Sequence, residues 1–597
     1  MSEIQNLYGY HGANPFLDIN GRDFSDEAIQ EEFCPTTQFW SLFNSQHEIL
    51  IGTRGCGKTF LLKTMRRSML QKLDDPQAAE IVSQKKYIAF YIALQMERMA
   101  NIENVDRNNE EKIALFRFIF NSCLAISIIS EAIKYCKDMG EDNKQQALLL
   151  NSNLADRLYK LWFNEKTNDE IIDLDDLAIK INKLYFNFNF VKDSIDEIPS
   201  LFISDLCAPL SSAAPILSNF WDANEPTWIL AIDEAEFVNE LYQKIINSFM
   251  RSNPLHIILK IATLPYYWTT LETLNGNIEI SSGNDFNYKV LDMDSDSNDF
   301  KELTNKLCTN RLKRIVWPNN SKVSFTSLES FLGTIGNDSR LDYFRNEMNG
   351  ISDDEIRRGI YDNLSEARQN GSASKGDLSQ TIYKKYAPIY YVREIYKKKK
   401  GRYIPEWFAG SDVVRKITQG NPRMFINLMS QFFSYAISHN NFSLKDQHQV
   451  IVKYAHSICE ATKAIEKDGE IIYQNLTNIS KQLQHKTHEG KLKEVGCSFT
   501  LKKDDISNSG TDWIKRAISF SRLSVDESTI KNGITIDTKY VICNAFAVEY
   551  WLTMRSDYPT NVTLANTYNG DFADDQYQIS LFSEGINDEK SDTEDKL

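Results

Sequence analysis

The sequence contains no CxxC pair, although nine cysteines are scattered along its 597 residues. Their odd number and wide spacing argue against a disulfide framework and favour a reduced, intracellular protein. A zinc site is also disfavoured, because His485, His488 and Cys497 have no fourth ligand at zinc spacing. The chain shows no nucleophile–base arrangement for hydrolase or nuclease chemistry, and no internal repeat.

Positive charge is scarce as well. The chain has 67 Lys and Arg against 82 Asp and Glu, a net charge of −15. This balance works against a general nucleic-acid binder, whose phosphate contacts need a basic surface. Residues 571–597 alone hold nine acidic residues and two lysines, which is −7 of that charge and leaves −8 for the rest. We expect the tail, residues 561–597, to be disordered, because it has few core-forming side chains.

A signal peptide and a long apolar run are also missing. The first residues, MSEIQNLYGYHGANPF, have neither a basic start nor an apolar signal core. The most apolar run, residues 116–133, is interrupted by Asn121, Ser122 and Glu131 and is shorter than the roughly 20 apolar residues of a membrane span. We therefore expect no membrane partner, a cytoplasmic protein, and a buried helix at this run.

A glycine-rich stretch, IGTRGCGKTFLLK at residues 51–63, fits the pattern G-x-x-x-x-G-K-[ST]. The apolar run at residues 48–51 before it predicts a buried strand, and the apolar spacing from Phe60 to Leu73 predicts a helix after it. In that order, backbone N–H groups and the helix N-terminus surround phosphate oxygens, Lys58 neutralises them, and the Thr59 hydroxyl ligates Mg²⁺. The predicted nucleotide-binding loop comprises Gly52, Thr53, Arg54, Gly55, Cys56, Gly57, Lys58 and Thr59.

A phosphate loop of this kind needs a metal-holding acid at the end of a neighbouring strand. Residues 226–238, PTWILAIDEAEFV, supply an apolar strand that ends in Asp233 and Glu234. Asp233 is predicted to hold Mg²⁺ and Glu234 to polarise the attacking water. The 175 residues between Lys58 and Asp233 predict a helical insertion at about residues 96–218, beyond a strand at residues 87–94.

Two further segments complete the pattern. Residues 255–265, LHIILKIATLP, predict a buried strand that ends in Thr263, and residues 287–294 predict a last strand. Residues 417–429, ITQGNPRMFINLM, predict a helix that begins at Pro422, so Arg423 projects from near its start. A polar side chain at the strand tip, such as Thr263, is placed to sense either the γ-phosphate or the lytic water.

The stretches GTRGCGKT, ILAIDEAE, LKIATLP and QGNPR together resemble an AAA+ ATPase, and specifically its origin-recognition initiator-like branch. The resemblance covers roughly residues 14–437. It implies an α/β fold with a parallel five-stranded P-loop core and a helical lid. It also implies ATP and Mg²⁺ as cofactors, Thr263 as a first sensor and Arg423 as a second. Phe33 and Pro35 occupy the place where this branch surrounds the adenine.

One departure from the family concerns the arginine finger that completes a neighbouring subunit's site. No arginine lies between Thr263 and Lys289, and Arg251 is the nearest candidate. Arg251 fits a solvated helix end equally well, so a finger acting between subunits stays in doubt.

Length and composition, with 42% apolar residues, predict two to four domains. We expect an AAA+ core at residues 1–295, a lid at 296–440 with an insertion at about 317–410, and a winged-helix-like α+β module at 441–560. The lid insertion holds the main basic cluster, interleaved with tyrosines, which is either a nucleic-acid track or a solvated patch. The presumed recognition helix near residues 511–523 has few basic residues, which favours a protein contact. The basic cluster comprises Lys384, Lys385, Arg393, Lys397, Lys398, Lys399, Lys400 and Arg402.

These features predict an ATPase that uses turnover to switch its C-terminal module. The large insertions and the non-basic module are similar to the origin-recognition-like ATPases of bacterial antiviral systems, which work beside a separate effector protein. Two alternatives stay open: an ATP-gated DNA-binding initiator, and a nucleotide-bound signalling switch with little turnover. Homo-oligomers are a further expectation from the resemblance.

Overall fold

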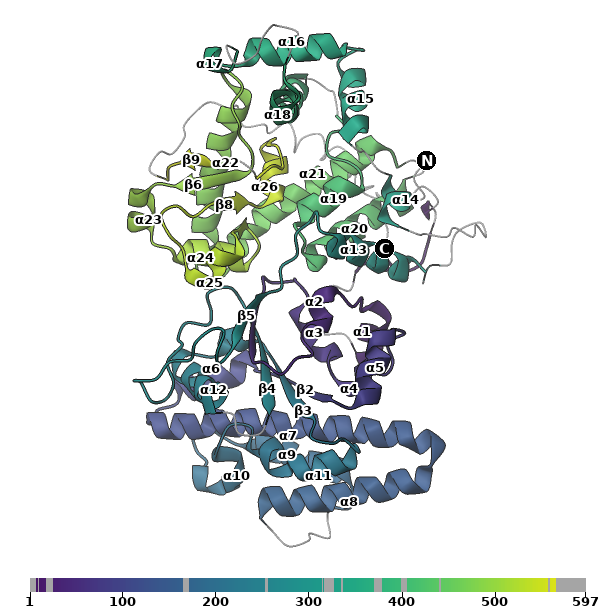
Figure 1. Ribbon diagram of the computed structural model, residues 1–597, viewed down its shortest axis with the longest axis vertical. Coiled ribbons are helices and arrows are strands. Elements are labelled where there is room, and N and C mark those ends of the chain that lie inside the picture. The colour runs from purple at the N-terminus through teal and green to yellow at the C-terminus, as the bar shows by residue number, and fades with distance from the viewer. Residues whose placement is uncertain are drawn as a thin grey trace, which may run out of the picture.

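The structure is a computed structural model that describes residues 7–8, 10–17, 25–164, 171–252, 256–313, 315, 327–333, 337–369, 378–398, 405–439, 442–556 and 559–564. Figure 1 shows a lower part built on a parallel sheet and an upper part of lid helices and the C-terminal module. Of the tail predicted to be disordered, residues 561–597, the part from residue 565 on lies outside the described residues, whereas its start belongs to a strand at Thr560–Val562.

Five parallel strands form the lower sheet in the order β2–β3–β4–β1–β5. They are β1 (Glu48–Ile51), β2 (Tyr87–Ala93), β3 (Thr227–Asp233), β4 (Ile257–Thr263) and β5 (Asn287–Val290). Strand β4 is buried along its whole length, as expected for an inner strand of a parallel sheet covered on both faces. The register pairs Ile51 with Thr263 and Ala93 with Asp233, so the carboxyl ends meet at one edge. The predicted five-stranded parallel α/β core is confirmed.

Helices cover both faces of this sheet because successive strand residues point to opposite sides. Leu50, Ile229 and Ala231 pack with the N-terminal helices, whereas Ile49 and Ile232 pack with the helices that follow β2. The N-terminal helices are α1 (Asp26–Glu32), α2 (Thr37–Trp40), α3 (Lys58–Thr64), α4 (Arg67–Leu70) and α5 (Pro76–Gln84).

The segment between β2 and β3 is helical. It contains α6 (Met96–Asn104), α7 (Asn109–Asp142), α8 (Lys144–Phe163), α9 (Leu174–Asn187), the 3₁₀ turn η2 (Ile195–Glu197), α10 (Ser200–Ile203) and α11 (Ala208–Phe220). Figure 1 shows α7 lying along the sheet, with α8 antiparallel beneath it. Helix α7 begins with a capping box between Asn108 and Glu111, which satisfies backbone donors of its first turn.

Helix α7 contains the apolar run for which we expected a buried helix. By length and composition alone, the helix at residues 109–141 could cross a membrane, because it contains an 18-residue window with a mean hydropathy of 1.9. However, 61% of this window is buried inside the protein, where Phe116, Leu124 and Ile128 are fully covered. The run is therefore a core helix that packs on β2 and on the helices α8 to α11.

Beyond β3 lie the 3₁₀ turn η3 (Ala235–Phe237) and α12 (Glu240–Ser252), and the lid follows β5. The lid helices are α13 (Asn298–Leu312), α14 (Leu328–Leu332), α19 (Ser411–Thr418), α20 (Pro422–Ser438) and α21 (Leu444–Ala461). Between α14 and α19 stand α15 (Asn337–Glu347), α16 (Asp353–Asn363), α17 (Glu366–Gln369) and α18 (Gln380–Lys398), at the top of Figure 1.

The C-terminal part is a mixed sheet with helices on it. Its strands are ordered β7–β8–β6–β9, with β6 antiparallel to β8 and parallel to β9. The strands are β6 (Ser498–Leu501), β7 (Leu523–Ser524), β8 (Tyr540–Ile542) and β9 (Thr560–Val562). The helices are η5 (Thr462–Ala464), α22 (Gly469–His488), α23 (Lys503–Ser509), α24 (Asp512–Ser519), α25 (Glu527–Asn532) and α26 (Asn544–Glu549). The winged-helix assignment and the domain boundaries stay predictions.

Candidate nucleotide-binding site

The glycine-rich loop connects β1 with α3, as its sequence predicts. Gly55 and Gly57 have φ angles of 92° and 102°, a left-handed conformation that favours glycine. The Lys58 ammonium folds back over the loop and donates to the carbonyl oxygens of Gly52 at 2.6 Å and Thr53 at 3.2 Å. The loop is thus closed around its own lysine, with the helix N-terminus facing the same space.

The lid approaches this loop closely at Gly55. A Cβ atom added to Gly55 would lie 2.7 Å from Cβ of Arg423 and 2.7 Å from Oδ1 of Asn421. The Arg423 N–H donates to the Gly55 carbonyl at 3.3 Å. Asn421 caps α20 by accepting from the N–H groups of Arg423 and Met424, and Pro422 occupies the first helical position. Local capping therefore fixes Arg423 against the loop.

The carboxyl end of β3 brings its acids to the same place. Asp233 is buried and accepts a 2.7 Å hydrogen bond from the Thr59 hydroxyl and a 3.1 Å bond from the Tyr91 hydroxyl. Glu234 has a φ of 62°, so the backbone turns sharply after Asp233. The structure thus joins the predicted metal ligands Thr59 and Asp233, which are 174 residues apart in sequence.

A cavity of about 480 Å³ lies where the loop, the end of β3 and the lid converge. One wall carries apolar side chains from the α1–α2 connection and the lid, including Phe33, Leu303, Leu307 and Ile426. The other wall is polar and comprises Arg54, Gly55, Cys56, Gly57, Lys58, Thr59, Asp233, Glu234, Glu236 and Arg423. A lining that combines apolar side chains with cations and carboxylates suits a ligand with a planar base and a metal-bound phosphate chain.

Burial shifts the pKa of two titratable groups in the cavity, the Glu236 carboxyl and the Cys56 thiol. Desolvation raises the pKa of the Glu236 carboxyl, while the charge of Lys58 acts in the opposite direction. Among the described residues, Oε2 of Glu236 is buried without a hydrogen-bond partner. Burial also raises the pKa of the Cys56 thiol to about 11, so this loop cysteine stays protonated at neutral pH.

The donor set fits Mg²⁺, a hard cation that takes oxygen ligands from one or two protein side chains and from substrate phosphates. Thr59 and Asp233 would hold the ion, which would neutralise charge on the phosphate oxygens. The cationic side chains of Lys58, Arg54 and Arg423 suit the phosphates themselves. No cluster of three or more His, Cys, Asp or Glu occurs among the described residues, consistent with a metal that is held largely by its nucleotide.

Four predicted site residues lie outside the cavity lining, namely Gly52, Thr53, Pro35 and Thr263. Thr263 is fully buried at the end of β4, and its carbonyl accepts from the Gly52 N–H at 3.2 Å. Its hydroxyl has no hydrogen-bond partner among the described residues. Pro35 does not line the cavity either, whereas its neighbours Phe33, Cys34 and Thr36 do.

Arg251, the candidate finger, ends helix α12 and pairs with a carboxylate of its own chain. Its guanidinium lies 2.6 Å from Asp285, which is largely buried. Desolvation acts to raise the pKa of the Asp285 carboxyl, but the backbone hydrogen bond from Ser281 and the Arg251 ion pair together lower it. The geometry therefore favours the alternative in which Arg251 is an ordinary helix-end residue, paired within its own subunit, over an arginine finger for a neighbouring subunit.

Three contributors to the site were absent from the sequence interpretation. Asp292, just after β5, accepts from the Thr53 N–H at 3.1 Å and from the Thr53 hydroxyl at 2.6 Å. Burial raises the pKa of this carboxyl, and the bonds from Thr53 counteract that effect. Glu236 and Tyr91 are the other two. A signal existed for Asp292 and Glu236, because acids at the carboxyl ends of parallel strands mark ligand sites. No local signal exists for Tyr91, whose partner is on another strand.

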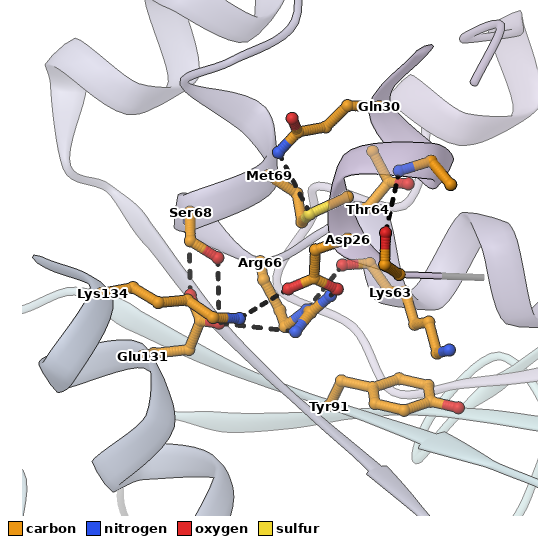
Figure 2. Close-up of polar contacts among 12 residues, drawn as sticks. Asp26, Gln30, Lys63, Thr64, Arg66, Ser68, Met69, Tyr91, Glu131 and Lys134 are labelled. Atoms are coloured by element: carbon orange, nitrogen blue, oxygen red, sulfur yellow. Dashed lines mark hydrogen bonds and ion pairs between the residues drawn. The ribbon is translucent and has the colours of Figure 1, made fainter. Parts of the chain in front are cut away.

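The helix predicted after the loop is interrupted. Apolar spacing predicted one helix up to Leu73, but α3 ends at Thr64 and Arg66 is extended before α4 begins. Figure 2 shows the reason: Arg66 pairs with Asp26 of α1 at 2.6 Å and with Glu131 of α7 at 3.6 Å. These tertiary ion pairs outweigh the helical periodicity at this position.

Figure 2 also shows how the segment between β2 and β3 is tied to this break. Glu131 of α7 accepts from the Ser68 N–H at 3.3 Å and from its hydroxyl at 3.0 Å, and Lys134 pairs with both Glu131 and Asp26. The Arg66 and Lys134 charges and hydrogen bonds outweigh desolvation and lower the pKa of Asp26 to about 2. Helix α7 is therefore anchored to α4, which follows the break, and to α1.

The described members of the basic cluster divide between core and surface, since Lys384, Lys397 and Lys398 are exposed. Arg393 is buried and donates to the carbonyls of Thr487, Glu489 and Gly490, at the end of α22. The interleaved tyrosines are core residues rather than a stacking platform, since Tyr386, Tyr390 and Tyr391 are buried. Lys385 pairs with Glu494 and Lys397 with Glu394. Lys399, Lys400 and Arg402 lie outside the described residues.

The presumed recognition helix also faces inward. It appears as α24, whose Arg516 pairs with Asp468 at 2.8 Å, and Arg522 beyond it donates to the Thr462 hydroxyl. The end of α24 contacts the glycine loop, where the Arg54 N–H donates to the Ser519 carbonyl at 3.0 Å.

The residues once considered as zinc ligands have other contacts. His485 lies 2.8 Å from Glu489, and Nε2 of His488 is 2.9 Å from the Trp551 carbonyl. The Cys497 thiol donates to the Arg555 carbonyl.

Comparison with known proteins agrees with this geometry. The model of a family described as ORC-CDC6-like matches residues 14–561. No curated protein matches the chain. AAA+ proteins of this family generally bind and hydrolyse ATP with Mg²⁺, and they often form oligomers. Because the match spans most of the chain and the fold is that of a P-loop core, the protein belongs to the ORC-CDC6-like family of AAA+ ATPases.

Proposed function

We propose that the protein is an ATPase that binds Mg·ATP between core and lid and uses turnover to switch its C-terminal module. The convergence of the loop, the β3 acids and the lid on one cavity carries this proposal. Lys58 would exchange its bonds to the Gly52 and Thr53 carbonyls for bonds to the β- and γ-phosphates. The apolar wall around Phe33 would receive the base.

In the proposed reaction, Glu234 orients a water molecule and accepts its proton as the oxygen attacks the γ-phosphorus. The bond between that phosphorus and the β–γ bridging oxygen breaks, and ADP and phosphate leave. Thr59 and Asp233 would hold Mg²⁺. Arg423, which lies in the lid, would donate to the γ-phosphate oxygens and stabilise the charge on them. Thr263 would act as the first sensor from β4, which is supported by its partnerless buried hydroxyl beside the loop.

A separate effector protein is the proposed partner, as in the bacterial antiviral systems that the chain resembles. A protein partner over DNA is supported by the pairing of Arg516 of α24 with Asp468 and by the use of Arg393 inside the fold. An anisotropy titration with duplex DNA tests this point. When a protein binds duplex DNA, the logarithm of its affinity falls linearly with the logarithm of the salt concentration, with a slope of about −0.9 for each phosphate contact. Tight DNA binding with such a salt dependence would support the initiator-like alternative instead.

Calorimetry with Lys58→Ala tests nucleotide binding itself. Hydrogen bonds to charged groups contribute about 1.5–3 kcal/mol, so ATP affinity should fall by about 10- to 100-fold. Lys63→Ala is the matched control, because Lys63 lies in the same helix α3 but outside the cavity lining. Equal ATP affinity in the two variants would refute the assignment.

A further inference from the structure

The turn between α24 and β7 lies against the glycine loop, far away in sequence. The Ser519 carbonyl accepts from the Arg54 N–H at 3.0 Å. Asn421 of the lid joins both sides, because its amide donates to the Arg54 carbonyl at 2.9 Å and to the Ser521 hydroxyl at 3.3 Å. The Ser519 hydroxyl donates to the Pro265 carbonyl, just after β4. Core, lid and C-terminal module thus meet at residue 54.

The Arg54 side chain has a defined environment at this junction. Its guanidinium carbon lies 4.4 Å from the centroid of the Phe520 ring, a cation–π contact. Arg54 is exposed overall, yet it also lines the cavity. The guanidinium N–H groups of Arg54 have no hydrogen-bond partner among the described residues. In contrast, the guanidinium of Arg251 is held by Asp285.

Stacking on an aromatic face leaves the edge of a guanidinium available. The five N–H donors lie in the guanidinium plane, and their fork geometry matches phosphate oxygens. The ring therefore fixes the plane without consuming its donors. Arg54 lines the same cavity as Glu234 and Glu236, the acids that follow β3.

We propose that Arg54 is a cation for the γ-phosphate supplied within the same chain, and that Phe520 of the C-terminal module is its positioning residue. The site is then complete only when the turn at residues 519–521 is docked on the loop. This inference rests on the proposed ATP site. It gives the chain a γ-phosphate cation that needs no second subunit, and it couples that cation directly to the C-terminal module.

The test compares the affinities of ATPγS and ADP by calorimetry, with Mg²⁺ and at fixed salt. Phe520→Leu removes the ring, whereas Phe520→Trp keeps an aromatic face. We expect Phe520→Leu to weaken ATPγS binding by about threefold to tenfold, the range of a cation–π contact, and to leave ADP affinity unchanged. Phe520→Trp should retain the wild-type preference. Arg54→Ala should lose it, and adding Phe520→Leu to Arg54→Ala should have no further effect.

Phe520 packs partly on the core, so its replacement also changes the packing there. Arg54→Lys, at an exposed position, is therefore a second variant. Lysine keeps the charge but has no planar fork, so the preference for ATPγS should fall as with Arg54→Ala. Equal losses of ATPγS and ADP affinity in Phe520→Leu would show a structural role and overturn the inference. So would an unchanged preference in Arg54→Ala. If the wild type binds neither nucleotide, the proposed function fails together with this inference; if it binds both equally, only this inference fails.

Discussion

The buried imidazole of His47 makes the stability of the sheet next to the glycine loop depend on pH. His47 directly precedes β1, and its Nδ1 accepts the backbone N–H of Leu259 in β4 at 3.0 Å. Burial lowers the pKa of His47 from 6.5 to about 4, and the charge of Lys260 acts in the same direction, whereas Asp285 opposes it. The imidazole is thus neutral in the folded protein.

Proton linkage at His47 makes the folded protein less stable as the pH falls. Below pH 6.5 the unfolded chain binds a proton at His47 that the folded chain binds only near pH 4. The stabilisation is therefore fully present above pH 6.5 and is lost as the pH falls toward 4. Between pH 7.5 and pH 5 the two pKa values give a loss of about 2 kcal/mol in the free energy of opening.

His47→Asn is the matched variant, because an amide oxygen can replace Nδ1 as the acceptor but does not titrate. We expect the amides of residues 257–263 to lose about 30-fold in hydrogen-exchange protection between pH 7.5 and 5 in the wild type, after correction for intrinsic rates, and not in the variant. Subtracting the variant removes the contributions of other titrating groups. An equal loss in both proteins would refute the reasoning.

Two further predictions concern turnover. Glu234→Gln keeps the shape of the side chain after Asp233 but removes the charge that would accept the proton, so ATP should persist on the protein. Light scattering with ATP, with ADP and without nucleotide shows whether the trapped form is a larger assembly. Undiminished ATPase activity would exclude Glu234 from this role. Arg423→Ala should lower turnover more than it lowers ATP affinity, because the side chain is proposed to act on the γ-phosphate. Equal losses of ATP and ADP affinity would assign it a structural role at Gly55 instead.

Much of the core was predictable because its signals are local. The loop from Gly52 to Thr59 is a contiguous motif whose backbone needs glycine at two positive φ angles. Strands β1 to β4 appear as mostly apolar runs because both faces of a parallel sheet are buried, whereas the edge strand β5 is only half-buried. Asp233 follows one such run directly, so its place at the sheet edge followed from the strand itself.

Other features are ambiguous within any local window. The tyrosines of α18 fit either a stacking surface or a core, and only the packing of Tyr386, Tyr390 and Tyr391 decides for the core. Likewise, apolar spacing continues past Arg66, but its ion pairs with Asp26 and Glu131 stop the helix there. Propensity and periodicity are weak compared with buried, charge-assisted contacts.

The sequence by itself determined the kind of site, because the loop, the acid-tipped strand and the lid motif each consist of neighbouring residues. Only the tertiary structure decided how the site is closed: Asp292 on the Thr53 backbone, Tyr91 on Asp233, and Phe520 beneath Arg54. Each of these contacts joins residues that are distant in the chain. Such contacts depend on which surfaces become buried together, and that is a property of the whole fold.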